Sequence, residues 1–161
     1  MTLSEIKKLG DPVLLMKSET VNRDELPGLL PYFEKMWSLI IEFRQVYGRG
    51  RAIAAPQIGL LKRIICLNID TPLALINPTI EMKSEELIEV WDDCMSFPNL
   101  LVLVKRHRMI DISFYDLQWK RHVWSLKDDM SELLQHEYDH LDGILAISRN
   151  PDVRYMKWVD K

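Results

Sequence analysis

The sequence has few of the features that mark specialised classes of protein. Its 161 residues include only two cysteines, which cannot form a disulfide framework and therefore favour a reducing cytoplasm. No stretch approaches the roughly 20 apolar residues that a membrane-spanning helix needs, and the first residues have no apolar signal-peptide segment. The formal net charge is only -3, which gives no reason to expect nucleic acid or an anionic membrane surface as a partner.

What is present is ordinary globular composition. Hydrophobic residues make up 47% of the chain and charged residues 28%. We find no repeat, low-complexity stretch or linker, so residues 1–161 are expected to form a single domain with its own core.

Hydrophobic periodicity places helices on both sides of a group of strands. A helical stripe runs from about residue 30 to 47, with Pro27 near its start and Gly48 at its end. Strand-like runs are expected at residues 63–69, 73–82 and 86–91, and a hairpin at residues 108–126 with its turn near Leu117 and Gln118. These elements predict an α+β fold, with the strands between an earlier and a later helix.

That later helix carries two of the four histidines. Asp128 or Asp129 is expected as its N-cap, and Gly143 suits the position after its last turn. A four-residue step places His136 and His140 on one helical face, where both imidazoles can bind one metal ion, with Glu137 beside them to move a proton. The alternative is a solvated helix with two unrelated histidines.

The third ligand distinguishes between classes of metal site. The metzincin pattern H-E-x-x-H-x-x-G-x-x-H is followed as far as Gly143, but its last histidine position is Ala146. No His or Glu follows His140, so the zinc proteases that take a ligand downstream are excluded. The third ligand is therefore expected upstream.

Two cysteines are available upstream. Cys66 lies within the apolar run "RIICLNI" and is interpreted as a small buried hydrophobic residue. Cys94, in "WDDCMSFP", stands at the edge of a strand, and its thiolate would complete a His₂Cys site with one position open for water. Spacing alone does not decide whether Cys94 is a ligand.

Three motifs, in order along the chain, resemble those of the peptide deformylase family. The segment "GRAIAAPQIG" (50–59) is similar to G-x-G-Φ-A-A-P-Q-x-G, "DDCMS" (92–96) to E-G-C-Φ-S, and "QHEYDHLDG" (135–143) to Q-H-E-x-D-H-L-x-G. The opening "IKKLGDPVLL" also resembles the start of the family. The resemblance covers residues 6 to 147 and implies an α+β domain with antiparallel strands around a central H-E-x-x-H metal-binding helix. It also implies an enzyme that removes the formyl group from the N-terminal methionine of nascent proteins.

The resemblance also implies a role for each site residue. The metal ligands would be Cys94, His136 and His140, holding one divalent ion, normally Fe²⁺ with Zn²⁺ or Ni²⁺ as substitutes. Glu137 would be the general acid/base, and Gln57 with the backbone N–H of Met95 would stabilise the developing oxyanion. For Gln57 the alternative is an ordinary exposed amide.

The substrate implied is an extended N-formylmethionyl peptide. Its backbone would pair near Arg51 and Ala52, and its methionine side chain would enter an apolar pocket beside the metal-binding helix. Such a substrate makes the ribosome a possible neighbour of the protein in the cytoplasm, through the nascent chain.

The sequence departs from the family pattern at four positions. Asp92 replaces the usual glutamate, and Asp93 the usual glycine before the ligand cysteine. Ala52 stands where a second glycine is expected, and Leu101 where an arginine is common, although Arg106 is retained. Asp93 could disfavour the thiolate or point to solvent, and the methyl group of Ala52 could exclude a ligand from a close backbone approach.

Three functions fit these observations. The first is an active deformylase, and the second is a metal amidase of the same fold with another N-acyl substrate. The third is a protein without enzymatic activity that keeps the site as a metal-binding or interaction module. Retention of Gln57 and Glu137 favours an enzyme, because a simple metal site needs neither an oxyanion donor nor an acid/base.

Overall fold

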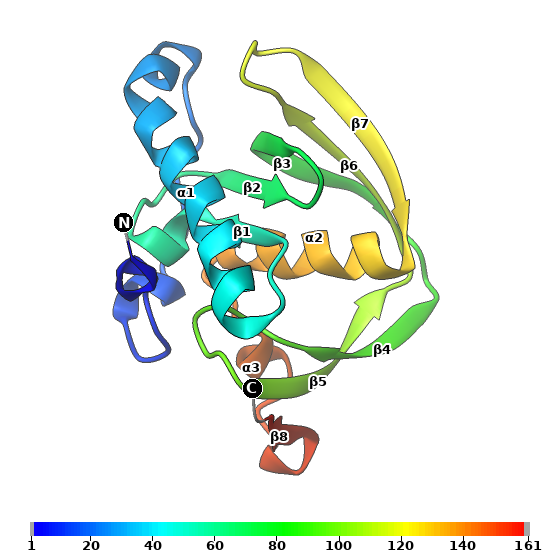
Figure 1. The fold of residues 1–161 in the computed structure, drawn as a ribbon. Helices are drawn as coiled ribbons and strands as arrows, with labels where there is room; N and C mark the ends of the chain where they lie inside the picture. Colours follow the sequence, from blue (N-terminus) through cyan, green and yellow to red (C-terminus); the bar gives the residue numbers. More distant parts are fainter. Residues whose placement is uncertain (1, 160–161) are drawn as a thin grey trace.

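The computed structural model describes residues 2–159 and contains two antiparallel sheets and three α-helices (Figure 1). The strands are β1 (Ala52–Ala54), β2 (Ile64–Asn68), β3 (Pro72–Lys83), β4 (Leu87–Asp92), β5 (Leu100–His107), β6 (Met109–Tyr115), β7 (Arg121–Lys127) and β8 (Met156–Trp158). The helices are α1 (Leu26–Tyr47), α2 (Asp128–Leu141) and α3 (Ala146–Arg149), with short 3₁₀ helices η1 (Leu3–Glu5), η2 (Pro12–Leu15), η3 (Arg23–Glu25), η4 (Ala55–Ile58) and η5 (Val153–Tyr155). The expected α+β class is confirmed.

The larger sheet has the strand order β1-β2-β3-β6-β7, and the smaller one β4-β5-β8. All neighbouring strands within the sheets are antiparallel, and β6 and β7 form the expected hairpin, with its turn at residues 116–120. Strand β1 lies at an edge of the larger sheet. Three strands, β1, β5 and β8, were not anticipated from the sequence. Strands β1 and β8 have only three residues each, and β5 follows a turn-rich segment.

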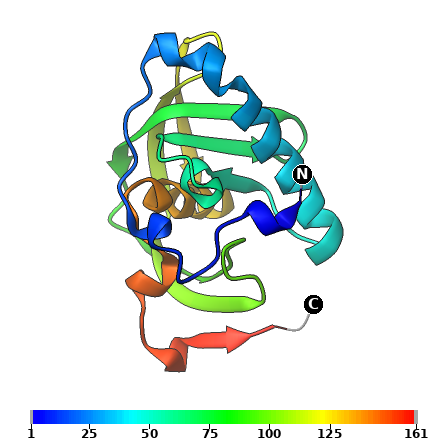
Figure 2. The same ribbon diagram turned by 90° about the vertical axis from the view of Figure 1, so that its left-hand side faces the viewer.

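The alternation of side chains along β2 explains how the larger sheet is covered on both faces. Ile64 and Cys66 face the cluster that includes Phe33, Met36 and Ile40 of α1. The intervening Ile65 and Leu67 face a second cluster that includes residues of α2. Figure 2 shows α1 crossing one side of the molecule, away from α2. Cys66 is thus a buried core residue, as expected.

Helix α2 is the central element of the fold. It lies between the two sheets and packs against β1 and β7 of the larger sheet and β5 of the smaller one (Figure 1). Because both flanks are covered, nine of its fourteen residues are buried. The fold therefore places the predicted histidine pair in the interior, and the solvated-helix alternative is wrong.

The helix boundaries differ slightly from those expected. Helix α1 begins at Leu26, ahead of residue 30, and ends at Tyr47, followed by Gly48 with a φ of +73°. The predicted N-cap of α2 is wrong: Lys127 occupies it with extended backbone, and Asp128 and Asp129 lie in the first turn, near the positive end of the helix dipole. Gly143, with a φ of +72°, follows the end of α2 as predicted.

Among residues 2–159, no helix is both long enough and apolar enough to span a bilayer.

Candidate metal centre

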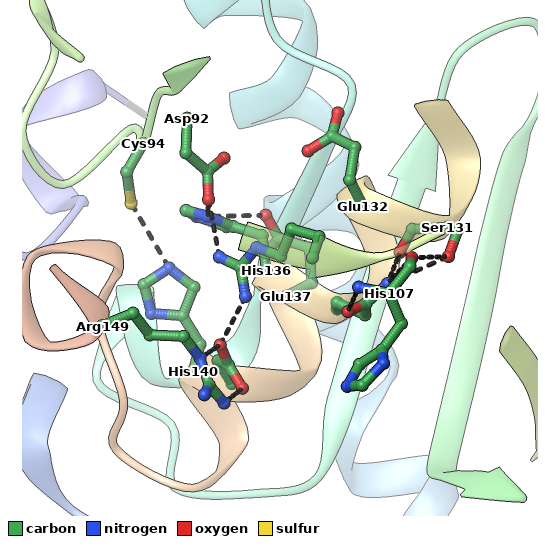
Figure 3. A network of polar contacts seen from close by, with 12 residues as sticks. Asp92, Cys94, His107, Ser131, Glu132, His136, Glu137, His140 and Arg149 are labelled. Atoms are coloured by element: carbon green, nitrogen blue, oxygen red, sulfur yellow. Dashed lines mark hydrogen bonds and ion pairs between the residues drawn. The ribbon is translucent and has the colours of Figure 1, made fainter. Parts of the chain in front are cut away.

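Helix α2 and the loop after β4 bring three candidate ligands together. His136 and His140 project from one face of α2, with ring centroids 5.0 Å apart. Cys94 follows the end of β4, and its Sγ lies 3.3 Å from Nε2 of His140 (Figure 3). One ligand atom from each of the three residues lies within 4.8 Å of the other two, and all three residues are buried. The structure thus brings Cys94, not Cys66, to the histidine pair.

The donor set fits a divalent transition metal. Zinc bonds of about 2.3 Å to sulfur and about 2.0 Å to nitrogen place two tetrahedral ligands roughly 3.5 Å apart, close to the 3.3 Å between Cys94 Sγ and His140 Nε2. Three protein ligands leave one position open, which is the arrangement of a catalytic site rather than a structural one.

Asp92 orients the first histidine. Nδ1 of His136 lies 2.9 Å from Oδ2 of Asp92, so Nδ1 donates and Nε2 remains free to face the cluster. Burial alone would raise the pKa of Asp92, but the neighbouring His136 and Arg106 lower it to about 2. Asp92, which is one methylene shorter than the glutamate usual in the family, is therefore ionised at neutral pH and accepts the hydrogen bond from His136.

A chain of ion pairs extends from this carboxylate (Figure 3). Arg106 of β5, only 2% exposed, donates to Asp92 at 2.6 Å and to Asp139 of α2 at 2.7 Å. Arg149 of α3 closes the chain on Asp139 at 2.6 Å and 2.7 Å. Arg106, which the sequence retains from the family pattern, thus links β4, β5 and α2 behind the candidate metal ligands.

Glu137 is a buried carboxylate beside the ligands. Its Oε1 lies 4.0 Å from Nε2 of His136. Its Oε2 is buried and has no hydrogen-bond partner within residues 2–159. Burial raises the pKa of Glu137 to about 7. A buried acceptor without a partner is costly, and a pKa near 7 suits a group that both takes up and releases a proton.

The orientation of the Gln57 side chain is fixed by a hydrogen bond from the backbone of Ala54. Its Oε1 accepts from the backbone N–H of Ala54 at 2.9 Å, so its NH₂ group must point the other way. That group lies 3.5 Å from Cys94 Sγ and 3.1 Å from Ser96 Oγ. The side chain is 1% exposed, so the exposed-amide alternative is wrong.

Comparison with known proteins decides the family. The family model for polypeptide deformylase matches residues 3–155. The chain belongs to the peptide deformylase family. A peptide deformylase from Dictyoglomus thermophilum is 36% identical over 151 residues, covering 91% of this chain and 92% of the relative.

Solved structures agree. The peptide deformylase from Thermotoga maritima matches with a TM-score of 0.81 and 30% identity, covering 89% of this chain and 95% of that one. The enzyme from Thermus thermophilus matches with a TM-score of 0.81 and 33% identity, over 91% of this chain and 85% of that one. The chain is therefore a deformylase that removes the N-terminal formyl group of nascent peptides, which confirms the first of the three expected functions.

Within this deformylase, the partly exposed side chain of Asp93 is held in an ion pair. Its carboxylate lies 3.0 Å from Nε of Arg49, which belongs to the loop that precedes β1. Gly50 follows Arg49 with a φ of +134°, and a Cβ there would lie 3.0 Å from Phe43 and 3.2 Å from Met95. This first glycine of the motif is therefore required, whereas Ala52 is accommodated within the second core cluster.

A cavity lies in front of the candidate ligands. Arg51 and Ala52 line it together with Cys94, His136 and Glu137. The lining also includes apolar side chains, Phe43, Trp91, Met95 and Leu133, and charged ones, Arg49, Asp93 and Glu132. The apolar pocket for a methionine side chain stays a prediction. The polar residues in the first turns of α2 can be seen in the sequence. Residues 51 and 132 are 81 positions apart, however, so no local pattern predicts their contact.

Proposed function

We propose that Cys94, His136 and His140 hold one divalent metal ion, Fe²⁺ by resemblance to the family, with Zn²⁺ and Ni²⁺ able to replace it. The supporting observation is that the three ligand atoms lie within 4.8 Å of one another, with the buried carboxylate of Glu137 beside them. The ion would polarise the formyl carbonyl and lower the pKa of a bound water.

Glu137 is the group that moves the proton. Its Oε2 faces no protein partner among the described residues, so it is free to accept a proton from water and pass it to the departing amine nitrogen. Because its pKa is near 7, the same carboxyl can act as base and then as acid at neutral pH.

Gln57 stabilises the formyl oxygen as it gains negative charge. Its NH₂ group is held toward Cys94 by the bond between its Oε1 and the N–H of Ala54, so no reorganisation is needed. The backbone N–H of Met95, next to the ligand cysteine, is the second donor in this proposal.

The peptide is placed along β1. Because β1 is an edge strand, the backbone near Arg51 and Ala52 is available to pair with an extended peptide. N-formylmethionyl peptides are the reference substrate, met as they leave the ribosome in the cytoplasm. Both cysteines are free thiols, in keeping with a reducing compartment, and residues 1–161 act as one catalytic domain.

The experiment is to load the purified protein with Fe²⁺ under anaerobic conditions and measure metal content and formate release from formyl-Met-Ala-Ser. The N-acetyl analogue should release no acetate. Cys94→Ala should lose the metal and the activity, whereas Cys66→Ala, the matched control, should keep both. Retention of metal by Cys94→Ala, or its loss only in Cys66→Ala, would contradict the ligand assignment.

A further inference from the structure

A second cavity, of about 260 Å³, lies beside α2 and away from the candidate metal ligands. The residues of α2 that line it are spaced by three and four positions, so they share one helical face, and this face differs from that of His136 and His140. They are Gln135, Tyr138, Asp139 and Asp142. Residues of β3, β5 and α3 form the other walls.

Positive charge is in excess in this cavity, although the chain as a whole has a net charge of -3. Its charged residues are four cations and two acids: Lys83, Lys105, Arg106, Arg149, Asp139 and Asp142. Both acids are already paired, Asp139 with the two arginines and Asp142 with Arg63 at 2.9 Å. An anion that enters the cavity therefore meets two positive charges in excess and no free carboxylate of the lining.

The two lysines of the cavity have no partner in the fold. Both are exposed, and the ion pairs that lysines form within residues 2–159 involve Lys35 and Lys62 alone. Arg149 bonds to Asp139 through Nε and Nη2, so the donors of its Nη1 remain available. Three cationic side chains from three different elements can therefore bind a ligand.

The backbone of β5 adds a neutral donor at the same place. Strand β8 pairs with residues 100–102 only, so residues 103–107 of β5 have no strand on that side. The peptide groups of Leu103 and His107 face this edge, where they bond to the side chains of Asn150 and Gln135. Because alternate residues of a strand direct their N–H groups to the same edge, the N–H of Lys105 faces it too, without a partner among the described residues.

We propose that this cavity binds a doubly charged phosphate, either inorganic phosphate or the terminal phosphate of a monoester. Such a group carries nearly two negative charges and three or more strong acceptor oxygens. These match the two excess positive charges and the separate donors of Lys83, Lys105 and Arg149. A carboxylate or a phosphodiester carries one charge and would leave part of the cavity uncompensated. The proposal does not depend on the metal chemistry proposed above.

The test is a titration of the zinc-loaded, ¹⁵N-labelled protein with inorganic phosphate at about pH 8, where phosphate is mainly doubly charged. The amide signal of Lys105 should shift and reach saturation, beyond any shift caused by sodium chloride at the same ionic strength. Shifts confined to residues around Cys94 and His136 would place the phosphate at the metal and would overturn the site.

A double variant, Lys83→Ala with Lys105→Ala, should raise the Kd for phosphate by about tenfold or more, because two charge-assisted hydrogen bonds are lost. The amide of position 105 remains as the reporter. The matched control, Lys17→Ala with Lys120→Ala, removes two exposed lysines outside the cavity and should leave the Kd unchanged.

Ethyl phosphate and diethyl phosphate identify the form of phosphate that is bound. Saturable shifts of the Lys105 amide by ethyl phosphate would mean that the cavity accepts a monoester, whereas a response to inorganic phosphate alone would mean that it holds the free ion. Both results support the site. No saturable shift with either compound, equally tight binding of the singly charged diethyl phosphate, or an unchanged Kd in the Lys83 and Lys105 double variant would overturn it.

Discussion

Nδ1 of His136 and Oδ2 of Asp92 lie 2.9 Å apart in the interior of the protein, both side chains being 5% exposed. The contact fixes the tautomer of the histidine, so that Nε2 carries the lone pair available to a metal. It also joins the metal cluster to the ion pair between Asp92 and Arg106.

Asp92→Asn should weaken metal binding without removing it. The amide keeps the size of the side chain but loses the charge that supports His136, and substitution of such supporting groups costs about 10- to 100-fold in metal affinity. Competition with a chromophoric chelator measures the affinity. Asp92→Glu is the control and should stay close to the wild type, and equal affinity in Asp92→Asn would show that the contact does not support the ligand.

Arg106→Met should be strongly destabilising. Arg106 is 2% exposed and balances both Asp92 and Asp139, so its removal leaves buried charge uncompensated, at a cost of about 3–5 kcal/mol in the free energy of unfolding. Arg149→Met is the comparison: Arg149 is 45% exposed, and Asp139 keeps Arg106, so about 1 kcal/mol is expected. Urea unfolding of both variants at pH 7 would reveal the difference, and equal costs would contradict a central role for Arg106.

Glu132 should make stability depend on pH. Its pKa is about 7 in the folded protein against an ordinary 4.5, so the folded state binds the proton more tightly. Its contribution is therefore most favourable below about pH 4.5 and is lost as the pH rises toward 7. Glu132→Gln, which cannot ionise, should match the wild type at pH 4.5 and exceed it at pH 8 by up to about 3 kcal/mol.

Urea unfolding at pH 4.5, 6 and 8 measures this effect, with Glu34→Gln as the exposed control that should follow the wild type throughout. If the difference in unfolding free energy between Glu132→Gln and the wild type is the same at all three pH values, the Glu132 carboxyl titrates normally.

Much of the site was predictable from sequence because its essential residues are local or carried by motifs. The four-residue step places His136 and His140 on one helical face, and the absence of any later His or Glu directs attention to the cysteines upstream. Alternation of apolar and polar residues at 110–115 predicted strand β6, and a turn after it predicted the β6–β7 hairpin.

What the sequence did not reveal depends on long-range pairing of charges. Arg106 meets Asp92 and Asp139, at separations of 14 and 33 residues, and no periodicity links these positions. Likewise, Arg51 and Glu132 are ordinary polar residues in the sequence, and only the packing of α2 against β1 makes them neighbours in the cavity. The apolar pocket was inferred from the family and stays a prediction, because the cavity is lined by apolar side chains as well as by these two charged ones.

Glu137→Gln tests the central claim most directly, with metal content and formate release measured on the same iron-loaded sample. The amide has nearly the same shape as the carboxyl but cannot transfer the proton. The protein should therefore bind about one metal ion per chain, like the wild type, while kcat for formyl-Met-Ala-Ser falls by about 10² to 10⁴-fold. A metal-replete Glu137→Gln protein with wild-type formate release would contradict the account.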